Sequence, residues 1–254
     1  MTGLTSIGEG AFYGCTNLEH IEISASVTSV GGGGIFNGCT SLTADEIDYS
    51  GSAFSVSTYS TNVYVVTTDA ESSGTRLISV FGSGASNLTT FDVSAYTEID
   101  GAFMGLTSLE SVTGTDNIVY IGNSTFSGCT ALTTFGSTSG EITVSDSVTE
   151  IGDNVFYGDT AITTISMPLN TVGSDIISGC TSLTSITFTS GSETNVTDDA
   201  FEGAGDGSTV VKVLNLSGTS IGTSVSTSPG WKGMSVYTSD YSTYGTTLVE
   251  VTEP

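Results

Sequence analysis

Short apolar segments alternate with polar turns along most of the chain. In "LEHIEI" (18–23) and "LTSITF" (183–188) the apolar residues stand two or three positions apart. This spacing is typical of short strands that bury one face and expose the other. Long segments with the 3.6-residue period of an amphipathic helix are scarce. The pattern therefore predicts more strand than helix.

These short segments belong to a longer repeat. The wording "IGEGAFYGCTNLEHIEI" (7–23) returns as "IGNSTFSGCTALTTF" (121–135) and as "SDIISGCTSLTSITF" (174–188). The repeats align on the aromatic residue of an Ala-Phe type pair, which is preceded by a β-branched residue and followed by Gly-Cys and Leu. The aligned positions are Phe12, Phe36, Phe103, Phe126, Phe156, Ile177 and Phe201.

The leucine positions define the length of the unit. Their successive spacings are 24, 46, 21, 23, 30 and 21, from Leu18, Leu42, Leu88, Leu109, Leu132, Ile162 and Leu183. A unit of roughly 23 residues, with one double step and one insertion, accounts for them. Such a period with this leucine pattern indicates a leucine-rich repeat solenoid, in which stacked coils form one continuous core.

The segment "LTSIGEGAFYGCTNLEHIEI" (4–23) resembles the BspA-like (Treponema-type) leucine-rich repeats of bacterial and protist surface proteins. The resemblance covers most of residues 4–203. It implies a parallel concave sheet from the L-x-x-I-x-I segments, a second short strand from the "VTSIG" segments and a bend at the Ala-Phe and Gly-Cys pairs. The predicted fold class is a β-rich solenoid, a right-handed leucine-rich repeat coil of roughly nine turns with a β-hairpin insertion and a C-terminal cap.

Two segments depart from the repeat. Within residues 43–87, the stretch "NVYVVTTDAESSGTRLISVF" (62–81) predicts a hairpin near residues 60–82, because two alternating strands flank a polar turn.

The other departure is at the C-terminal end. A closing segment resembling that of family members gathers Trp231, Tyr237, Tyr241 and Tyr244. We expect a solenoid over residues 1–217 and a capping segment over 218–254, since an uncovered end exposes core and strand edge. No comparable cap precedes Leu4, which suggests a longer array or a neighbouring chain stacked there.

Charge excludes several classes of partner. Lys and Arg total 3 and Asp and Glu total 27, so the formal net charge is −24. Such a surface repels phosphate backbones and anionic lipids, which argues against nucleic acid and bare acidic membranes. No stretch approaches the roughly 20 apolar residues of a membrane span, so direct membrane insertion is not expected. No signal peptide is visible after Met1.

The four cysteines, Cys15, Cys39, Cys129 and Cys180, share one repeat position. We expect reduced, buried thiols that pack as small apolar groups. A disulfide between Cys15 and Cys39 is the alternative, because strands of neighbouring coils lie about 4.8 Å apart. With no C-x-x-C pair and one histidine, His20, we predict neither a zinc site nor a cofactor.

Catalytic arrangements find little support. A nucleophilic pair of Cys15 and His20 would need an exposed thiol and a third orienting group. A Ser-His-Asp triad meets the same shortage of histidines. Acidic residues are frequent enough for a glycosidase-type pair, but no spacing singles one out. We therefore predict no catalytic residues.

Two sets of residues are candidates for binding. The segment "TDDAFEGAGDGS" (197–208) is a weak calcium candidate, with a solvated turn as the alternative reading. It carries Asp198, Asp199, Glu202 and Asp206. The residues between the leucines of the concave strands form the second set, either as a hydroxyl-rich binding face or only as residues suited to a half-exposed strand. They are Glu19, His20, Glu22, Thr89, Thr90, Asp92, Glu110, Thr133, Thr134, Thr163, Thr164 and Thr184.

The leading functional hypothesis, which rests on the resemblance, is a non-catalytic extracellular or surface-exposed protein that mediates protein binding or adhesion through its solenoid face. Its partner would be a protein or glycan on a cell surface or in the extracellular matrix. The alternative is a structural component of a filament or virion that self-associates head to tail, since stacking coil edges gives open assemblies. A glycan-active enzyme is a third hypothesis.

Overall fold

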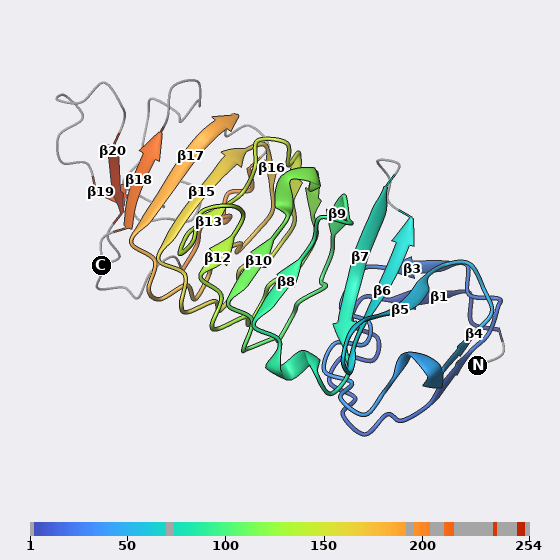
Figure 1. Ribbon diagram of the computed structural model, residues 1–254. Coiled ribbons are helices and arrows are strands. Elements are labelled where there is room, and N and C mark those ends of the chain that lie inside the picture. The colour runs from blue at the N-terminus through green and yellow to red at the C-terminus, as the bar shows by residue number, and fades with distance from the viewer. Residues whose placement is uncertain are drawn as a thin grey trace.

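A computed structural model of the protein describes residues 3–69, 74–191 and 196–203, together with three C-terminal strands (Figure 1). It is a β-solenoid of about eight turns with parallel sheets, against the roughly nine predicted. Helix in the described residues is limited to three short 3-10 turns. These are η1 (Ala44–Glu46), η2 (Ala85–Asn87) and η3 (Thr115–Asn117).

A nine-stranded sheet runs along most of the solenoid in the order β19-β20-β18-β17-β15-β13-β12-β10-β8 (Figure 1). From β8 to β18 all neighbours are parallel, as the L-x-x-I-x-I segments predicted. Because the coils stack in register, the inward-facing residue of each strand meets its counterpart in the next. The strands of this long sheet are β8 (Thr90–Asp92), β10 (Ser111–Thr113), β12 (Thr134–Phe135), β13 (Ile142–Thr143), β15 (Thr164–Leu169), β17 (Ser185–Gly191) and β18 (Val211–Asn215).

The "VTSIG"-type segments form strands on a second side of the coils. A seven-stranded sheet has the order β16-β14-β11-β9-β7-β6-β5. Its four shortest strands are parallel and align a row of buried β-branched residues, one from each coil. They are β9 (Glu98–Ile99), β11 (Tyr120–Ile121), β14 (Glu150–Ile151) and β16 (Thr171–Val172).

The first two coils form separate small sheets. β1 (Ser6–Gly8) pairs with β3 (Ser29–Gly31), and β2 (Ile21–Ile23) pairs with β4 (Ile47–Tyr49), both parallel. Neither pair is hydrogen-bonded to the two larger sheets. The strands of these coils therefore repeat the solenoid pattern without continuing its long sheet.

The predicted hairpin is present and separates two hydrophobic cores. β6 (Val63–Asp69) and β7 (Thr75–Phe81) are antiparallel, and an additional strand, β5 (Ser55–Ser60), pairs with β6. Val65 and Leu77 belong to the large core of the later coils, whereas Val66 and Ile78 belong to the core of the first two. The hairpin is thus buried on both faces, and β7 joins it to the later coils by parallel pairing with β9.

The predicted core register is confirmed. Six of the seven aligned positions are fully buried, and only Phe12, on the first coil, is half-buried. Ring centroids of Phe103 and Phe126 lie 5.3 Å apart and those of Phe126 and Phe156 lie 5.4 Å apart, both stacked nearly parallel. Stacked aromatic pairs of this kind add to the stability gained from burial.

The cysteine position has a specific hydrogen bond. All four cysteines are free, so the alternative Cys15–Cys39 disulfide is not formed. The Sγ atom of Cys129 lies 3.1 Å from the carbonyl oxygen of Phe103, and Cys39 and Cys180 contact Phe carbonyls of their preceding coils in the same way. The prediction of buried thiols holds for these three. Cys15 is exposed, because no coil of the described residues covers the outer side of the first coil.

Asp159 occupies the cysteine position of the coil between Cys129 and Cys180. It is fully buried, and neither carboxyl oxygen has a hydrogen-bond partner. Burial raises the pKa of Asp159 to about 8, although the backbone amides of Cys129 and Gly128 partly oppose the rise. At neutral pH the carboxyl group is therefore mostly protonated, which avoids the cost of burying its negative charge.

Most of the predicted cap lies outside the described residues, including Trp231, Tyr241 and Tyr244. Two of its strands are described: β20 (Leu248–Val251) pairs antiparallel with β18, and β19 (Val236–Tyr237) pairs antiparallel with β20. The parallel sheet therefore ends in antiparallel strands. The division at residue 217 stays a prediction.

Candidate functional site

The outward side of the long sheet, here called the strand face, carries two rows of polar side chains in register. One row contains Thr90 and Ser111, and the other contains Asp92 and Thr113. Further along the sheet the rows continue through Thr164 and Ser185 and through Ser166 and Thr187, whereas the hydroxyl of Thr143 is buried. These rows arise because each strand alternates sides, so the residues flanking a buried centre both face outward.

Most of the predicted binding residues on these coils are exposed. Thr163 and Thr184 stand next to each other, and the Thr184 hydroxyl donates to the Thr163 carbonyl at 2.9 Å. Asp92 accepts a hydrogen bond from the Ser94 amide at 2.9 Å, which lowers the pKa of its carboxyl group. Thr164 is half-buried. The exposed members are Thr89, Thr90, Asp92, Glu110, Thr133, Thr163 and Thr184.

Thr134 differs from this set because it is buried. Its unit is the 30-residue one, and the additional residues form a turn and the strand β13 between β12 and β15. The Gly140 amide donates to the Thr134 hydroxyl at 2.9 Å, so the turn covers this side chain. Thr134 therefore does not contribute to the exposed strand face.

Glu19, His20 and Glu22 are exposed but lie on the other side of a break in the sheet. Glu22 is on β2, whose only strand partner in the described chain is β4, and the long sheet begins at β8. Tyr59 of β5 lies at the edge of β8 instead, and its hydroxyl accepts a hydrogen bond from the Asp92 amide at 3.1 Å. The predicted residues are thus divided between two surfaces.

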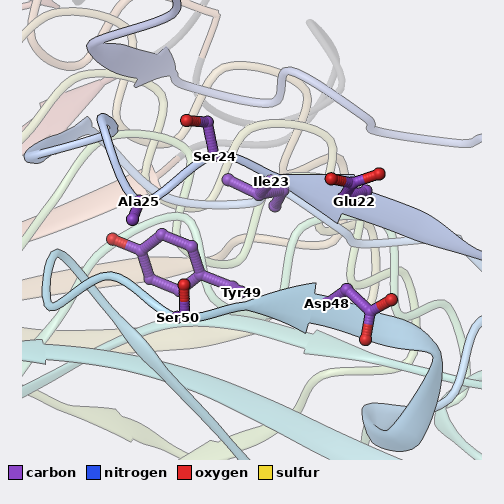
Figure 2. Close-up of a pocket in the computed structure, with 7 residues that line it drawn as sticks. All are labelled: Glu22, Ile23, Ser24, Ala25, Asp48, Tyr49 and Ser50. Carbon is purple, nitrogen blue, oxygen red and sulfur yellow. The ribbon is translucent and has the colours of Figure 1, made fainter. Parts of the chain in front are cut away.

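The first-coil surface contains a pocket of about 480 Å³ between β2 and β4 (Figure 2). Glu22 and Asp48 are register partners on these strands, and both carboxylates lie at one end of the pocket. The Tyr49 ring lies toward the other end, near Ala25 and Ser50. Its hydroxyl is held by the Val27 carbonyl and the Ala53 amide, at 2.9 and 2.8 Å.

His20 stands beside this pocket between two carboxylates. Its Nδ1 lies 3.4 Å from Glu46 and its Nε2 lies 3.7 Å from Asp48. These contacts are ion pairs only when His20 is protonated, and all three side chains are at least half exposed, so any attraction is weak and screened by salt. The structure thus pairs His20 with carboxylates, whereas Cys15 has no ion pair or hydrogen bond to it among the described residues.

Sequence reasoning missed Glu46, Asp48 and Tyr49. The available signal was "ADEIDY" (44–49), which places an acidic run on the strand that follows Leu42. The strand isoleucine Ile47 follows Leu42 by five positions, whereas Ile21 follows Leu18 by three in "LEHIEI" (18–23). This difference made the register of the segment hard to recognise. Together these residues make an acidic surface suited to binding cations or basic side chains.

The single arginine is half-buried and lies against two buried carboxylates, Glu98 and Asp100. The Nε atom of Arg76 on β7 donates to Glu98 on β9 at 2.6 Å, and its guanidinium lies 4.9 Å from the centre of the Tyr120 ring. Asp100 lies 3.8 Å from the same guanidinium, and burial raises the pKa of its carboxyl group to about 6 despite this positive charge. These contacts join the hairpin to the following coil rather than forming an open site.

The described residues contain no candidate metal site. No group of three or more His, Cys, Asp or Glu side chains there is placed to hold a metal ion. Of the weak calcium candidates, Asp198 and Glu202 are exposed, Asp199 is half-buried, and Asp206 lies outside the described residues. The described part of the chain also contains no helix with the length and apolar character needed to cross a membrane.

Comparison with known proteins gives a family match. The family model for the BspA type leucine rich repeat region matches six copies, over residues 1–100 and 79–206. No curated protein matches the chain significantly.

Two solved structures are similar. One is a leucine rich cell surface protein from Faecalibacterium prausnitzii, with 22% identity over 87% of this chain and 52% of that chain and a TM-score of 0.48. The other is a leucine-rich repeat protein from Bacteroides ovatus, with 21% identity over 84% of this chain and 64% of that chain and a TM-score of 0.36. This chain therefore spans about half the length of the first and less than two thirds of the second.

Proposed function

Because this chain belongs to the BspA-type leucine-rich repeat family, we propose that it is a non-catalytic binding protein that contacts other proteins at a cell surface or in the extracellular space. The observation that carries the proposal is the strand face, on which polar side chains repeat in register over successive coils. A large, regular and exposed surface is suited to recognition rather than to enclosing a reacting group.

Order within the strand face supports binding. The Thr133 and Thr184 hydroxyls donate to carbonyls of the preceding coil, at 3.3 and 2.9 Å. Side chains held in this way lose less conformational entropy when a partner binds. The buried coil centres beneath them keep the backbone in place, so the face is rigid before contact.

The acidic pocket between β2 and β4 is a second exposed surface, separate from the strand face. Glu22 and Asp48 are register partners on neighbouring strands, and His20 is not among the residues that line the pocket. A partner that brings basic side chains would relieve the repulsion between the two carboxylates. We therefore expect the partner to be a protein with a basic or mixed surface, and the affinity to fall as salt rises.

The test is a binding screen with matched variants. The purified chain is measured by biolayer interferometry against a panel of extracellular matrix proteins and of immobilised glycans. A strand-face variant, Thr90→Lys with Thr113→Lys, is compared with a control of the same added charge, Thr160→Lys with Thr181→Lys, which adds lysines to exposed turns outside the strands. We expect the strand-face variant to weaken binding at least tenfold and the control to leave it unchanged.

The opposite outcomes are also defined. Loss of binding in the control and not in the strand-face variant would contradict the use of this face. Binding only to glycans would replace protein recognition with carbohydrate recognition. Self-association, the alternative expected from the sequence, is measured separately by sedimentation velocity, where growth of large species with concentration would support assembly.

A further inference from the structure

A groove on the bend of the coils carries chemistry that the strand face does not use. Its volume is about 780 Å³, and it extends from the first coil to the coil of Phe156. We call it the tyrosine trough and define it by Glu9, Tyr13, Met104, Gly105, Gly128 and Tyr157. Tyr13 and Tyr157 directly follow core residues Phe12 and Phe156, so the repeat itself places them outside the core.

The floor of the trough is open because it consists of glycines. Gly105 and Gly128 stand at equivalent positions of neighbouring coils, at φ of +78° and +76°. A Cβ atom on Gly105 would lie 2.5 Å from the Tyr13 hydroxyl, so Tyr13 reaches across this glycine. Gly105 thus makes room for the Tyr13 hydroxyl, and the space above Gly128 stays open because a Cβ atom there would meet only backbone atoms of Gly105, at 3.8 Å or more.

The walls of the trough expose aromatic surface. Tyr13 is 48% and Tyr157 49% exposed, and Tyr59 is the third large apolar side chain exposed in the described chain. In the same described part, neither Tyr13 nor Tyr157 stacks on another ring, whereas Tyr59 covers Phe91 at a centroid distance of 4.0 Å. The two tyrosine faces are thus available to a partner, with Met104 as flexible apolar lining.

The rim of the trough is negatively charged. Glu9 lines it, and partial burial together with the negative charge of Asp153 raises the pKa of the Glu9 carboxyl group. The positive charge of Arg76 is taken up by Glu98 and Asp100. A cation bound at the rim would therefore meet an uncompensated carboxylate.

We propose that the tyrosine trough binds a Lys or Arg side chain from a basic segment of a protein partner. The aliphatic stem packs on Met104 and the cationic head lies against the tyrosine faces, close to Glu9. Cations are attracted to aromatic faces, and long basic side chains bury their stems on apolar surface. An anionic ligand is repelled by the net charge of −24, and a neutral glycan leaves Glu9 without a counter-charge.

This site lies apart from the strand face, so it goes beyond the proposed function and is tested on its own. The probe is a fluorescein-labelled peptide of alternating lysine and glycine, and fluorescence anisotropy gives its dissociation constant. A glutamate–glycine peptide of opposite charge is the control. Tyr13→Leu with Tyr157→Leu removes both rings, and Tyr13→Phe with Tyr157→Phe keeps them. We expect the leucine variant to bind the lysine peptide about tenfold more weakly and the phenylalanine variant to bind as the native chain does.

Charge is tested by a second matched pair. Glu9→Gln and Glu110→Gln remove the same charge, but Glu110 is an exposed residue of the strand face. The proposal requires Glu9→Gln to weaken binding more than Glu110→Gln. Equal effects would show attraction by net charge alone and would overturn the proposal.

Further outcomes separate the two surfaces. The lysine peptide could instead lose binding in Glu22→Gln with Asp48→Asn while the leucine variant binds it normally. That result would show that the peptide binds at the acidic pocket, and it would overturn the proposal for the tyrosine trough. Saturable binding of chitotriose, abolished by the leucine variant, without lysine-peptide binding would replace it with a glycan site. Thermal melting checks that each variant folds, and Tyr157→Leu alone serves if the double variant does not.

Discussion

Asp159 should make the stability of this protein fall as the pH rises. It is fully buried in a position that is cysteine in the coils on either side. Burial raises its pKa from 3.8 to about 8. Because the folded-state pKa is the higher one, folding takes up a proton between these values, and the contribution to stability is complete below pH 3.8 and lost as pH rises toward about 8.

The size of the effect follows from the shift. Each pH unit between the two pKa values costs about 1.4 kcal/mol, so raising the pH from about 5 to about 8 costs roughly 4 kcal/mol. Asp159→Asn removes the ionisation while keeping a polar side chain of nearly the same size. We expect this variant to match the native chain near pH 4 and to be more stable by several kcal/mol near pH 8. Asp159→Cys should behave similarly, since it restores the thiol of the neighbouring coils.

The assay is urea denaturation of native and Asp159→Asn protein, followed by circular dichroism at a series of pH values. The quantity compared is the difference in unfolding free energy between the two, which cancels the titration of all other carboxylates. Asp116→Asn, at an exposed position, is the control for the same change of side chain outside the core. A difference that stays constant with pH, or that favours the native chain at high pH, would refute a buried protonated Asp159.

Three other predictions concern packing, charge and thiols. Phe126→Ala should lower the unfolding free energy measured in urea by about 3–5 kcal/mol, because a fully buried ring is lost between two stacked neighbours. Ser127→Ala should lower it far less, and equal losses would contradict the core register. Arg76→Met should cost about 3 kcal/mol in the same assay at neutral pH, since it removes the positive charge beside the buried carboxylates of Glu98 and Asp100. An unchanged midpoint would show that the hairpin is held by its apolar faces alone. Ellman's reagent should titrate Cys15 alone in the folded protein and all cysteines after denaturation, and fast reaction of the other thiols would contradict their burial.

Much of the fold could be predicted because neighbouring coils are nearly equal in sequence. Phe103, Phe126 and Phe156 pack on one another, so the environment of each is set by copies of its own motif. The hairpin was predictable from alternation and a polar turn. The candidate site was harder to predict from the sequence. Thr134 looks like Thr164 in sequence, and it is buried only because a turn from its own longer unit folds over it.

By itself the sequence determined the repeat length, the core register and the acidic, strand-rich character of the chain, since all three depend on patterns within one unit. The tertiary structure alone decided where the sheet breaks between β4 and β8, that the hairpin is buried on both faces and that Tyr13 and Tyr157 wall one groove. It also decided that Asp159 is enclosed between two thiol-bearing coils. The physical reason is that these features arise from contacts between residues of different coils, where an insertion or one substituted side chain changes the surroundings without changing the local pattern.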